Sequence, residues 1–253
     1  MKKLSFIRKE FMEQFRTGKA LILLAVFFLF GMMSPLLAKL MPEILGSMEM
    51  QGIKIVLPEP TATDAYAQFF KNFTQMGILI LLLVFGQTLS NELTRGTLIN
   101  ILAKGLPRHS VLLSKYIAAV SLWSFGYAMA AGVNIGYTIY LFRDAKVNQL
   151  FLALFCLWLF GCLILVMILL SAVIAPGSFG GLILTAFIII LMLLLGSFPS
   201  LDSYNPITLA SENMNLINGI TNADFLITPI LVSLFFTLSS LVAAIIIFNK
   251  KRL

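Results

Sequence analysis

Few residues of this 253-residue sequence could do chemistry, and their placement excludes several classes of protein. The long apolar segments hold no Asp, Glu, Arg or His in their interiors, whereas proton- or sodium-driven carriers usually need such buried groups to couple the ion. The paired Asp, the Ser with His and the HExxH motif of intramembrane proteases are missing as well. His109 is the only histidine, which excludes a His-based metal cluster. The sequence also lacks a GxxxxGKS/T loop and cannot bind ATP in that way.

One polar stretch, Asn91 to Tyr116, interrupts the mostly apolar chain and lies between two apolar segments. The stretch carries a single acid, Glu92, and four basic residues, which are Arg95, Lys104, Arg108 and Lys115. Lys and Arg accumulate in cytoplasmic loops because they resist translocation. We therefore expect this stretch on the cytoplasmic side of a membrane.

Part of this stretch is patterned as a short amphipathic helix. Leu98, Ile101 and Leu102 share one face at i, i+3 and i+4 spacing, and Gly105 followed by Pro107 predicts where the helix ends. A second helix is predicted to begin after Pro107 and to run into the next apolar segment. The short helix could be a docking peg for a soluble partner, or it could be a surface helix that only lies on the lipid headgroups.

The composition identifies an all-α integral membrane protein. Hydrophobic residues make up 59% of the chain, charged residues only 11%, and the mean hydropathy is +0.97, whereas about 25% of the residues in soluble proteins are charged. The formal charge is +7, but the basic residues lie at the termini and in the central stretch rather than on one globular face. They are therefore expected to set topology beside anionic lipid, and no nucleic-acid partner is expected.

Periodicity and length divide the chain into a single transmembrane domain, 1–253. Six segments are long enough to span a hydrocarbon core of about 30 Å: 20–38, 74–90, 115–142, 149–175, 178–198 and 228–249. Residues 1–19 read as an interfacial amphipathic helix, 91–114 as the cytoplasmic loop, and 39–73 and 199–227 as outer segments. The last of these is predicted to form short re-entrant helices in the outer leaflet, or else a plain surface loop with one helix. Gln87 and Asn134 could form hydrogen bonds that hold helices together, or they could line a path through the membrane.

The distribution of basic residues predicts the orientation. Thirteen of the 18 Lys and Arg residues fall in segments that an inside N-terminus would place in the cytoplasm, and the other five are Lys39, Lys54, Lys71, Arg143 and Lys146. The positive-inside rule thus favours a multi-pass protein with both termini cytoplasmic. The short inner loops and modest length favour a bacterial cell membrane.

The central stretch resembles a known family. The run Asn91-Glu92-x-x-x-Gly96-Thr97-Leu98, followed by Pro107-Arg108 and by Leu113-Ser114-Lys115-Tyr116 at the entry to a span, is similar to the permease subunits of type-2 ATP-binding-cassette exporters. The six-span plan, the N-terminal helix and the Asn205-Pro206 turn before the last span fit the same family. The resemblance covers essentially the whole chain.

The resemblance implies a coupling helix at about Glu92 to Ala103, which would sit in a cleft of a separate ABC ATPase. Glu92 would form ion pairs at that boundary, and Gly96 would allow close approach of the backbone. The residues implied in coupling to the ATPase are Glu92, Arg95, Gly96, Thr97, Leu98, Ile101 and Leu102. ATP and Mg would be bound by the ATPase, so the chain is not expected to be an enzyme, or to hold a catalytic residue, a metal or a cofactor of its own.

The resemblance also implies a second permease, either a copy of this chain or a homologue. The second and fifth spans would line the path between the two, with Phe85, Gln87, Thr185 and Phe187 as path residues. Spans without fixed charge suit a hydrophobic or amphipathic substrate, such as an antimicrobial or toxic peptide, a drug or a lipid. The alternative is a membrane immunity or sequestration protein that binds a toxin or an enzyme and transports nothing. A membrane enzyme is a weaker third hypothesis, because no catalytic constellation is visible.

Overall fold

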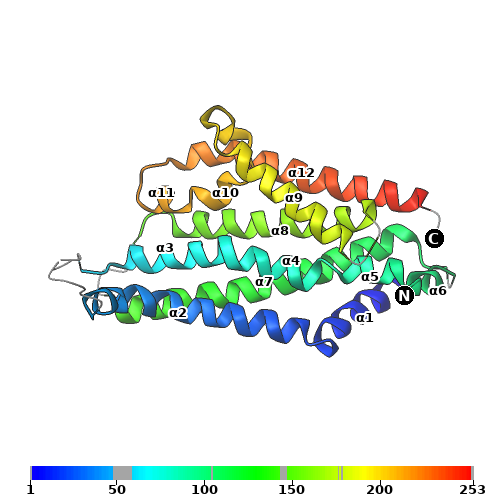
Figure 1. Cartoon of the computed structure of the whole chain (residues 1–253), viewed down its shortest axis with the longest axis horizontal. Coiled ribbons are helices and arrows are strands. Elements are labelled where there is room, and N and C mark those ends of the chain that lie inside the picture. The colour runs from blue at the N-terminus through cyan, green and yellow to red at the C-terminus, as the bar shows by residue number, and fades with distance from the viewer. Residues whose placement is uncertain are drawn as a thin grey trace.

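The computed structural model describes residues 2–47, 59–103, 105–142, 147–175, 177 and 179–251. The side chains at 2–4, 45–47, 99–101 and 199 lie outside that description. All secondary structure in the described part of the chain is helical, and α8 lies at the centre of the bundle (Figure 1). The elements in chain order are α1 (Lys2–Arg16), α2 (Lys19–Ser47), α3 (Ala62–Asn72), the π-helix η1 (Phe73–Gly77), α4 (Ile78–Phe85), α5 (Thr88–Thr94), α6 (Thr97–Ala103), α7 (Arg108–Leu141), α8 (Leu150–Ile174), α9 (Gly180–Leu195), the 3-10 helix η2 (Pro199–Tyr204), α10 (Thr208–Ser211), α11 (Asn213–Ile217) and α12 (Ala223–Lys250).

Five helical runs within the described residues are long and apolar enough to cross a membrane: Lys19–Ile44, Ala62–Thr94, Arg108–Leu141, Leu150–Ile174 and Ala223–Lys250. The second of these joins α3, η1, α4 and α5. The predicted span 178–198 appears as α9, which has 16 residues. At 1.5 Å per residue α9 is about 24 Å long, shorter than the hydrocarbon core. The prediction of a multi-pass, all-helical membrane protein is therefore confirmed. The layout with six spans stays a prediction.

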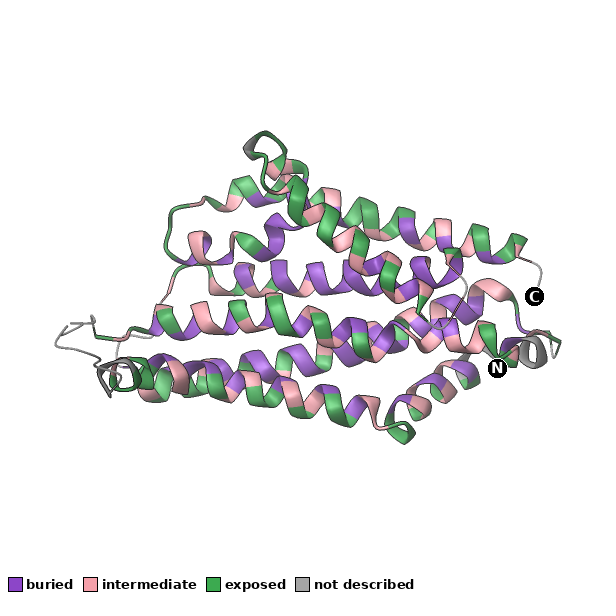
Figure 2. Cartoon of the chain, viewed as in Figure 1, coloured by how far each residue is buried: buried purple, intermediate pink, exposed green. Residues whose placement is uncertain are grey.

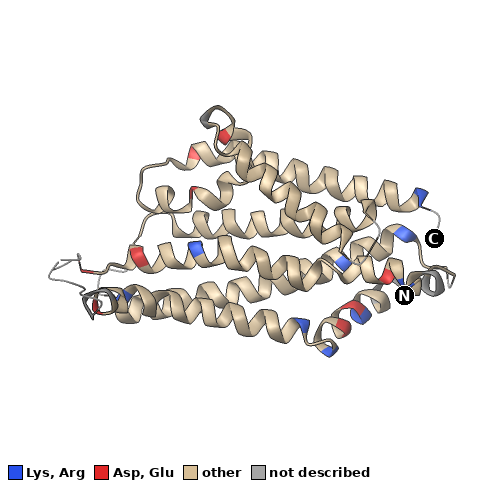
Figure 3. Cartoon of the chain, in the orientation of Figure 1, with Lys and Arg blue, Asp and Glu red and all other residues tan. Residues whose placement is uncertain are grey.

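The charges mark the two ends of the bundle. Lys, Arg, Asp and Glu lie near the ends of the helices, and the middle of the bundle is almost free of them (Figure 3). The marked N- and C-terminal ends of the chain lie at the same end of the bundle as α6 (Figure 1). We call this the terminal end. The arrangement agrees with a chain that crosses an apolar layer and returns to the side on which it started.

Several helices extend beyond the predicted spans. α2 continues through Pro35 and Pro42 to Ser47, so the segment predicted as 39–73 is helical at both of its ends. α3 begins after a capping box, in which the Thr61 backbone N–H donates to Asp64 Oδ2 at 2.8 Å. The segment predicted as 199–227 holds three short helices, η2, α10 and α11, in agreement with the expected short helices.

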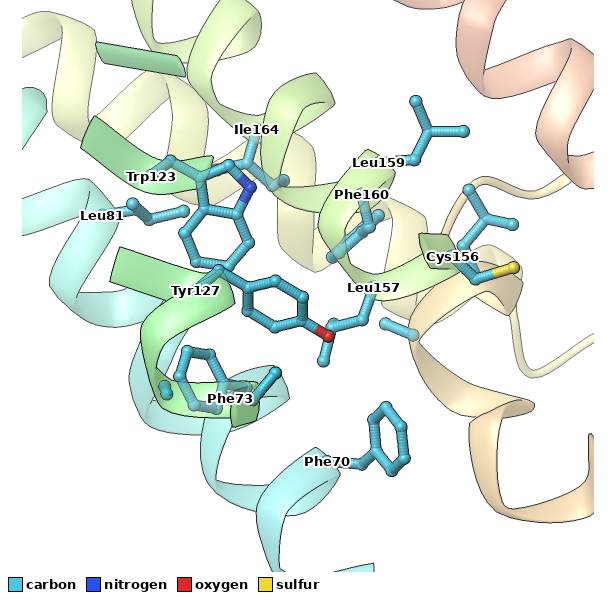
Figure 4. Packing of buried hydrophobic residues seen from close by; sticks show 14 of the residues in the cluster. Phe70, Phe73, Leu81, Trp123, Tyr127, Cys156, Leu157, Leu159, Phe160 and Ile164 are labelled. Atoms are coloured by element: carbon cyan, nitrogen blue, oxygen red, sulfur yellow. The ribbon is translucent and has the colours of Figure 1, made fainter. Parts of the chain in front are cut away.

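The packed core lies between α7 and α8. The rings of Trp123 and Tyr127 on α7 are stacked with their centroids 5.0 Å apart, and Phe73 of η1 lies against Tyr127 (Figure 4). A Cβ at Gly161 of α8 would lie 2.3 Å from the Trp123 ring, so only glycine admits the indole there. The polar tips are satisfied, because Trp123 Nε1 and Tyr127 Oη each donate to a carbonyl of α8 at 3.0 Å.

Burial decreases away from this core. α8 is buried along most of its length, whereas α9 and α12 expose large parts of their surface (Figure 2). Asn134 of α7 is buried and donates to the Gly31 carbonyl of α2 at 3.5 Å, as expected of a hydrogen bond that holds two helices together.

Candidate functional site

The predicted coupling region forms a corner at the terminal end of the bundle. The prediction of one helix from Glu92 to Ala103 is wrong, because α5 ends at Thr94 and α6 begins at Thr97. Gly96 between them has φ of +66°, in the left-handed region that residues with a Cβ rarely adopt. The chain therefore turns at Gly96. The predicted stop is confirmed, since Gly105 has φ of +83° and Pro107 caps the start of α7.

The apolar face of α6 packs against the protein itself. Leu98 is 1% exposed and Leu102 packs against the same cluster, which also contains Phe6 of α1 and Val111 of α7. Leu98 is therefore an anchor of the corner, and its predicted place on a docking face is wrong for this conformation. The side chain of Ile101 lies outside the described residues. Arg95 and Thr97 are exposed.

Lys115 of α7 lies at the centre of a buried ion-pair network. Its Nζ donates to Glu92 Oε1 of α5 at 2.8 Å and to Glu10 Oε2 of α1 at 2.9 Å. The side chains of Lys115 and Glu10 are 5% and 1% exposed. Glu92, which the resemblance implied as a partner of the ATPase, thus pairs inside this chain. Its second carboxylate oxygen is buried without a hydrogen-bond partner among the described residues.

Lys9 extends this network along α1. Its Nζ lies 2.7 Å from Glu13 Oε2, 3.2 Å from Glu10 Oε1 and 3.8 Å from Glu92 Oε1. Burial lowers the pKa of Lys9, but the hydrogen bond to Glu13 and the fields of Glu10 and Glu92 outweigh it and raise the pKa overall. Burial likewise raises the pKa of Glu13, but its bond to Lys9 prevails and lowers it. We call these five residues, Lys9, Glu10, Glu13, Glu92 and Lys115, the Lys115 cluster.

The three carboxylates of the Lys115 cluster also have the spacing of a metal site. One oxygen each of Glu10, Glu13 and Glu92 lies within 4.8 Å of the others. Two ammonium groups, however, already approach these oxygens to between 2.7 and 2.9 Å. Lys9 and Lys115 therefore largely neutralise the negative charge of the three carboxylates. We interpret the cluster as a set of ion pairs that connects α1, α5 and α7.

An open cleft of about 500 Å³ lies beside the Lys115 cluster. It separates α1 and the start of α2 from the segment between Gln87 and Thr97. Lys19 Nζ donates to Thr88 Oγ1 across it at 2.9 Å. The lining residues are Lys9, Glu13, Thr17, Lys19, Gln87, Thr88, Asn91, Glu92, Arg95 and Thr97.

The four predicted path residues do not share one surface within this chain. Phe85 is buried on α4, and Gln87 lines the cleft at the terminal end. Thr185 is buried on α9 and donates to the Gly181 carbonyl at 2.7 Å, whereas Phe187 on the same helix is 60% exposed. Of the four, Phe187 is the one with an apolar side chain open to lipid or to a partner.

A second set of contacts joins the helix ends at the terminal end. Arg108, at the start of α7, donates from Nη1 to the carbonyls of Phe248 at 2.9 Å, Asn249 at 3.1 Å and Lys251. Lys251 Nζ in turn donates to the Val173 carbonyl of α8 at 2.7 Å. The last carbonyls of α12 and α8 are thus capped by cations, which suits the negative end of a helix dipole.

Sequence reasoning singled out Glu92 but missed Glu10 as its neighbour. Phe6, Glu10 and Gln14 follow one another at i+4 spacing, and all three are buried in the structure. A carboxylate in line with apolar residues on an interfacial helix was the available signal. Gln14 also lines a small cavity of about 30 Å³ with Lys115, and its Oε1 has no described partner. The cavity has room for about one water molecule.

No family model matches the chain. Over an alignment 159 residues long, the chain is 23% identical to the "Uncharacterized transmembrane protein YxlG" of Bacillus subtilis (strain 168), and the alignment covers 61% of the chain. The match covers 62% of the length of that relative. Together with the span-length helices, this likeness supports a multi-pass membrane protein.

Proposed function

We propose that this chain is the membrane-spanning permease subunit of an ATP-driven exporter of the ABC type. The observation that carries the proposal is the α5–α6 corner and its attachment to the Lys115 cluster. A force on the corner would pass through Glu92 and Lys115 into α7, and through Glu10 into α1. Coupling of this kind needs a rigid element that two sites can move together.

A separate ABC ATPase would supply ATP hydrolysis, with ATP and Mg bound on that subunit. Its closure would displace the corner, and the ion pairs and the buried Leu98 would oblige α1, α5 and α7 to follow as a rigid body. The chain itself would do no chemistry. Among the exposed residues at the corner, we assign Thr94, Thr97 and Ala103 to the contact with the ATPase.

We further propose six crossings, with the terminal end in the cytoplasm. α9 is too short to span a full hydrocarbon core alone, but Ser197, Phe198 and η2 continue from its end. A crossing by α9 accounts for the position of both termini at one end of the bundle (Figure 1). A cytoplasmic terminal end also places the basic central stretch on the inner side, as the positive-inside rule favours.

The surfaces of α9 and α12 support the proposed substrate class. Both helices expose large apolar side chains, including Phe187 and Phe235, and the described residues of both lack a charge between their ends. We propose that a second permease, a copy or a homologue, faces this surface and that a hydrophobic or amphipathic substrate passes between the two. Antimicrobial or toxic peptides, drugs and lipids have this character.

Site-specific photo-crosslinking in native membranes tests the assignment. A photo-reactive residue in place of Thr97 should capture an ATPase subunit, identified by mass. The same residue in place of Tyr140, which is 83% exposed near the other end of α7, is the matched control and should capture none. Capture of a toxin or another enzyme at the corner, with no ATPase, would favour the sequestration protein instead.

A further inference from the structure

The cleft beside the Lys115 cluster contains two cations that form no ion pair with the carboxylates of the cluster. Lys19 and Arg95 both line it, and no described carboxylate forms an ion pair with either. Lys19 is partly buried, and its ammonium donates a hydrogen bond to the neutral hydroxyl of Thr88. A partly desolvated ammonium with a neutral partner is costly unless an anion approaches it.

Both carboxylates that line the cleft already form ion pairs with lysines other than Lys19. Glu13 pairs with Lys9 and Glu92 with Lys115. The lining therefore holds three cations, Lys9, Lys19 and Arg95, against two carboxylates. This excess of positive charge favours a ligand with a net negative charge over a zwitterion.

The cleft lies at the boundary between apolar and polar parts of the chain. Lys19 is the first residue of α2, and Thr88 is the first residue of α5, which two residues separate from the end of the apolar helix α4. One turn from Lys19, on the same face of α2, Ile22 is exposed, and Leu83 is exposed on α4. A ligand in the cleft would thus have charge on one side of it and apolar surface on the other.

We infer that this cleft binds the headgroup of an anionic phospholipid, with the phosphate held by Lys19 and Arg95. The acyl chains would lie along the exposed apolar side chains of α2 and α4. The guanidinium of Arg95 can donate two parallel hydrogen bonds to a phosphate, and the ammonium of Lys19 supplies a compact charge. The amides of Gln87 and Asn91 line the same cleft and can donate to the remaining oxygens. The inference goes beyond the proposed export function and does not depend on it.

Native mass spectrometry of the full chain in detergent tests this inference. Phosphatidylglycerol is added and compared with phosphatidylcholine of the same acyl chains. We expect one phosphatidylglycerol to remain bound under conditions that remove phosphatidylcholine. Each of Lys19→Gln and Arg95→Gln should weaken its binding about fivefold, and the double variant about 25-fold. Arg16→Gln, which removes an exposed cation of α1 outside the cleft, should leave binding unchanged.

Three results would overturn the inference. The first is equal retention of the two lipids by the unaltered chain, which requires no variant to fold. The second is an equal loss of phosphatidylglycerol in Arg16→Gln. The third is displacement of the lipid by inorganic phosphate or by a bound ATPase, since the cleft would then serve a free anion or a partner protein. Retained binding in the charge-conserving variant Lys19→Arg would support the inference.

Discussion

Removal of the ammonium of Lys115 should release α1 from the bundle. In Lys115→Met, Glu10 and Glu92 both lose a charged partner that lies within 2.9 Å in the unaltered protein. Breaking a buried ion pair by removal of one partner costs about 3–5 kcal/mol. Lys9 remains 3.2 Å from Glu10 and 3.8 Å from Glu92, so we expect the lower limit, about 3 kcal/mol, which is roughly a 150-fold increase in the opening equilibrium of α1.

Hydrogen–deuterium exchange of the protein in nanodiscs measures this opening directly. Peptides from α1 should exchange faster in Lys115→Met, whereas peptides from the α7–α8 core should change little. Lys71→Met, which removes an exposed lysine of α3, is the matched control and should behave like the unaltered chain. The double variant Glu10→Gln with Lys115→Met should cost at least about 1 kcal/mol less than the sum of the two single variants, since the two residues are in contact. If α1 exchanges at an unchanged rate in Lys115→Met, the ion-pair cross-link between α1 and α7 is refuted. The same holds if the cost of the double variant equals the sum of the two single-variant costs.

Three further predictions concern the corner, the core and pH. Gly96→Ala should destabilise the corner by about 1–2 kcal/mol, because a Cβ is strained at this positive φ, and should speed exchange in α6. Gly161→Ala should lower the melting temperature and change the fluorescence of Trp123, because the added methyl meets the indole; Gly132→Ala, with open space around it, should do neither. The lowered pKa of Glu13 means that its contribution to stability is present above its unfolded pKa of about 4.3 and is lost as the pH falls through the folded value. Exchange of α1 should therefore rise at acid pH, and Glu13→Gln should reduce this rise.

Hydrophobic periodicity predicted the apolar helices well but placed several of their ends incorrectly. The Gly105 and Pro107 stop was readable because both residues act locally on the backbone. The Gly96 break was readable as well, since a glycine inside an amphipathic pattern can mark a turn, but the family resemblance implied one helix from Glu92 to Ala103. The capping box at Thr61 also signalled a helix start that the hydropathy did not show.

The Lys115 cluster could not be predicted from local pattern. Lys115 and Glu10 are 105 positions apart, and their contact depends on how α1 folds back against α7. Sequence spacing indicates which face of a helix a residue occupies, but not which distant helix covers that face. For the same reason Glu92 was assigned a partner outside the chain, although its ammonium partner lies on the next long helix.

We propose that this chain is a permease that works with a separate ATPase. Co-purification of the chain from native membranes in mild detergent, with its partners identified by mass, tests this claim most directly. We predict an ABC ATPase subunit in stoichiometric amount, with ATP hydrolysis that amphipathic compounds stimulate. A chain that purifies alone, or with a toxin and no ATPase, would contradict the claim.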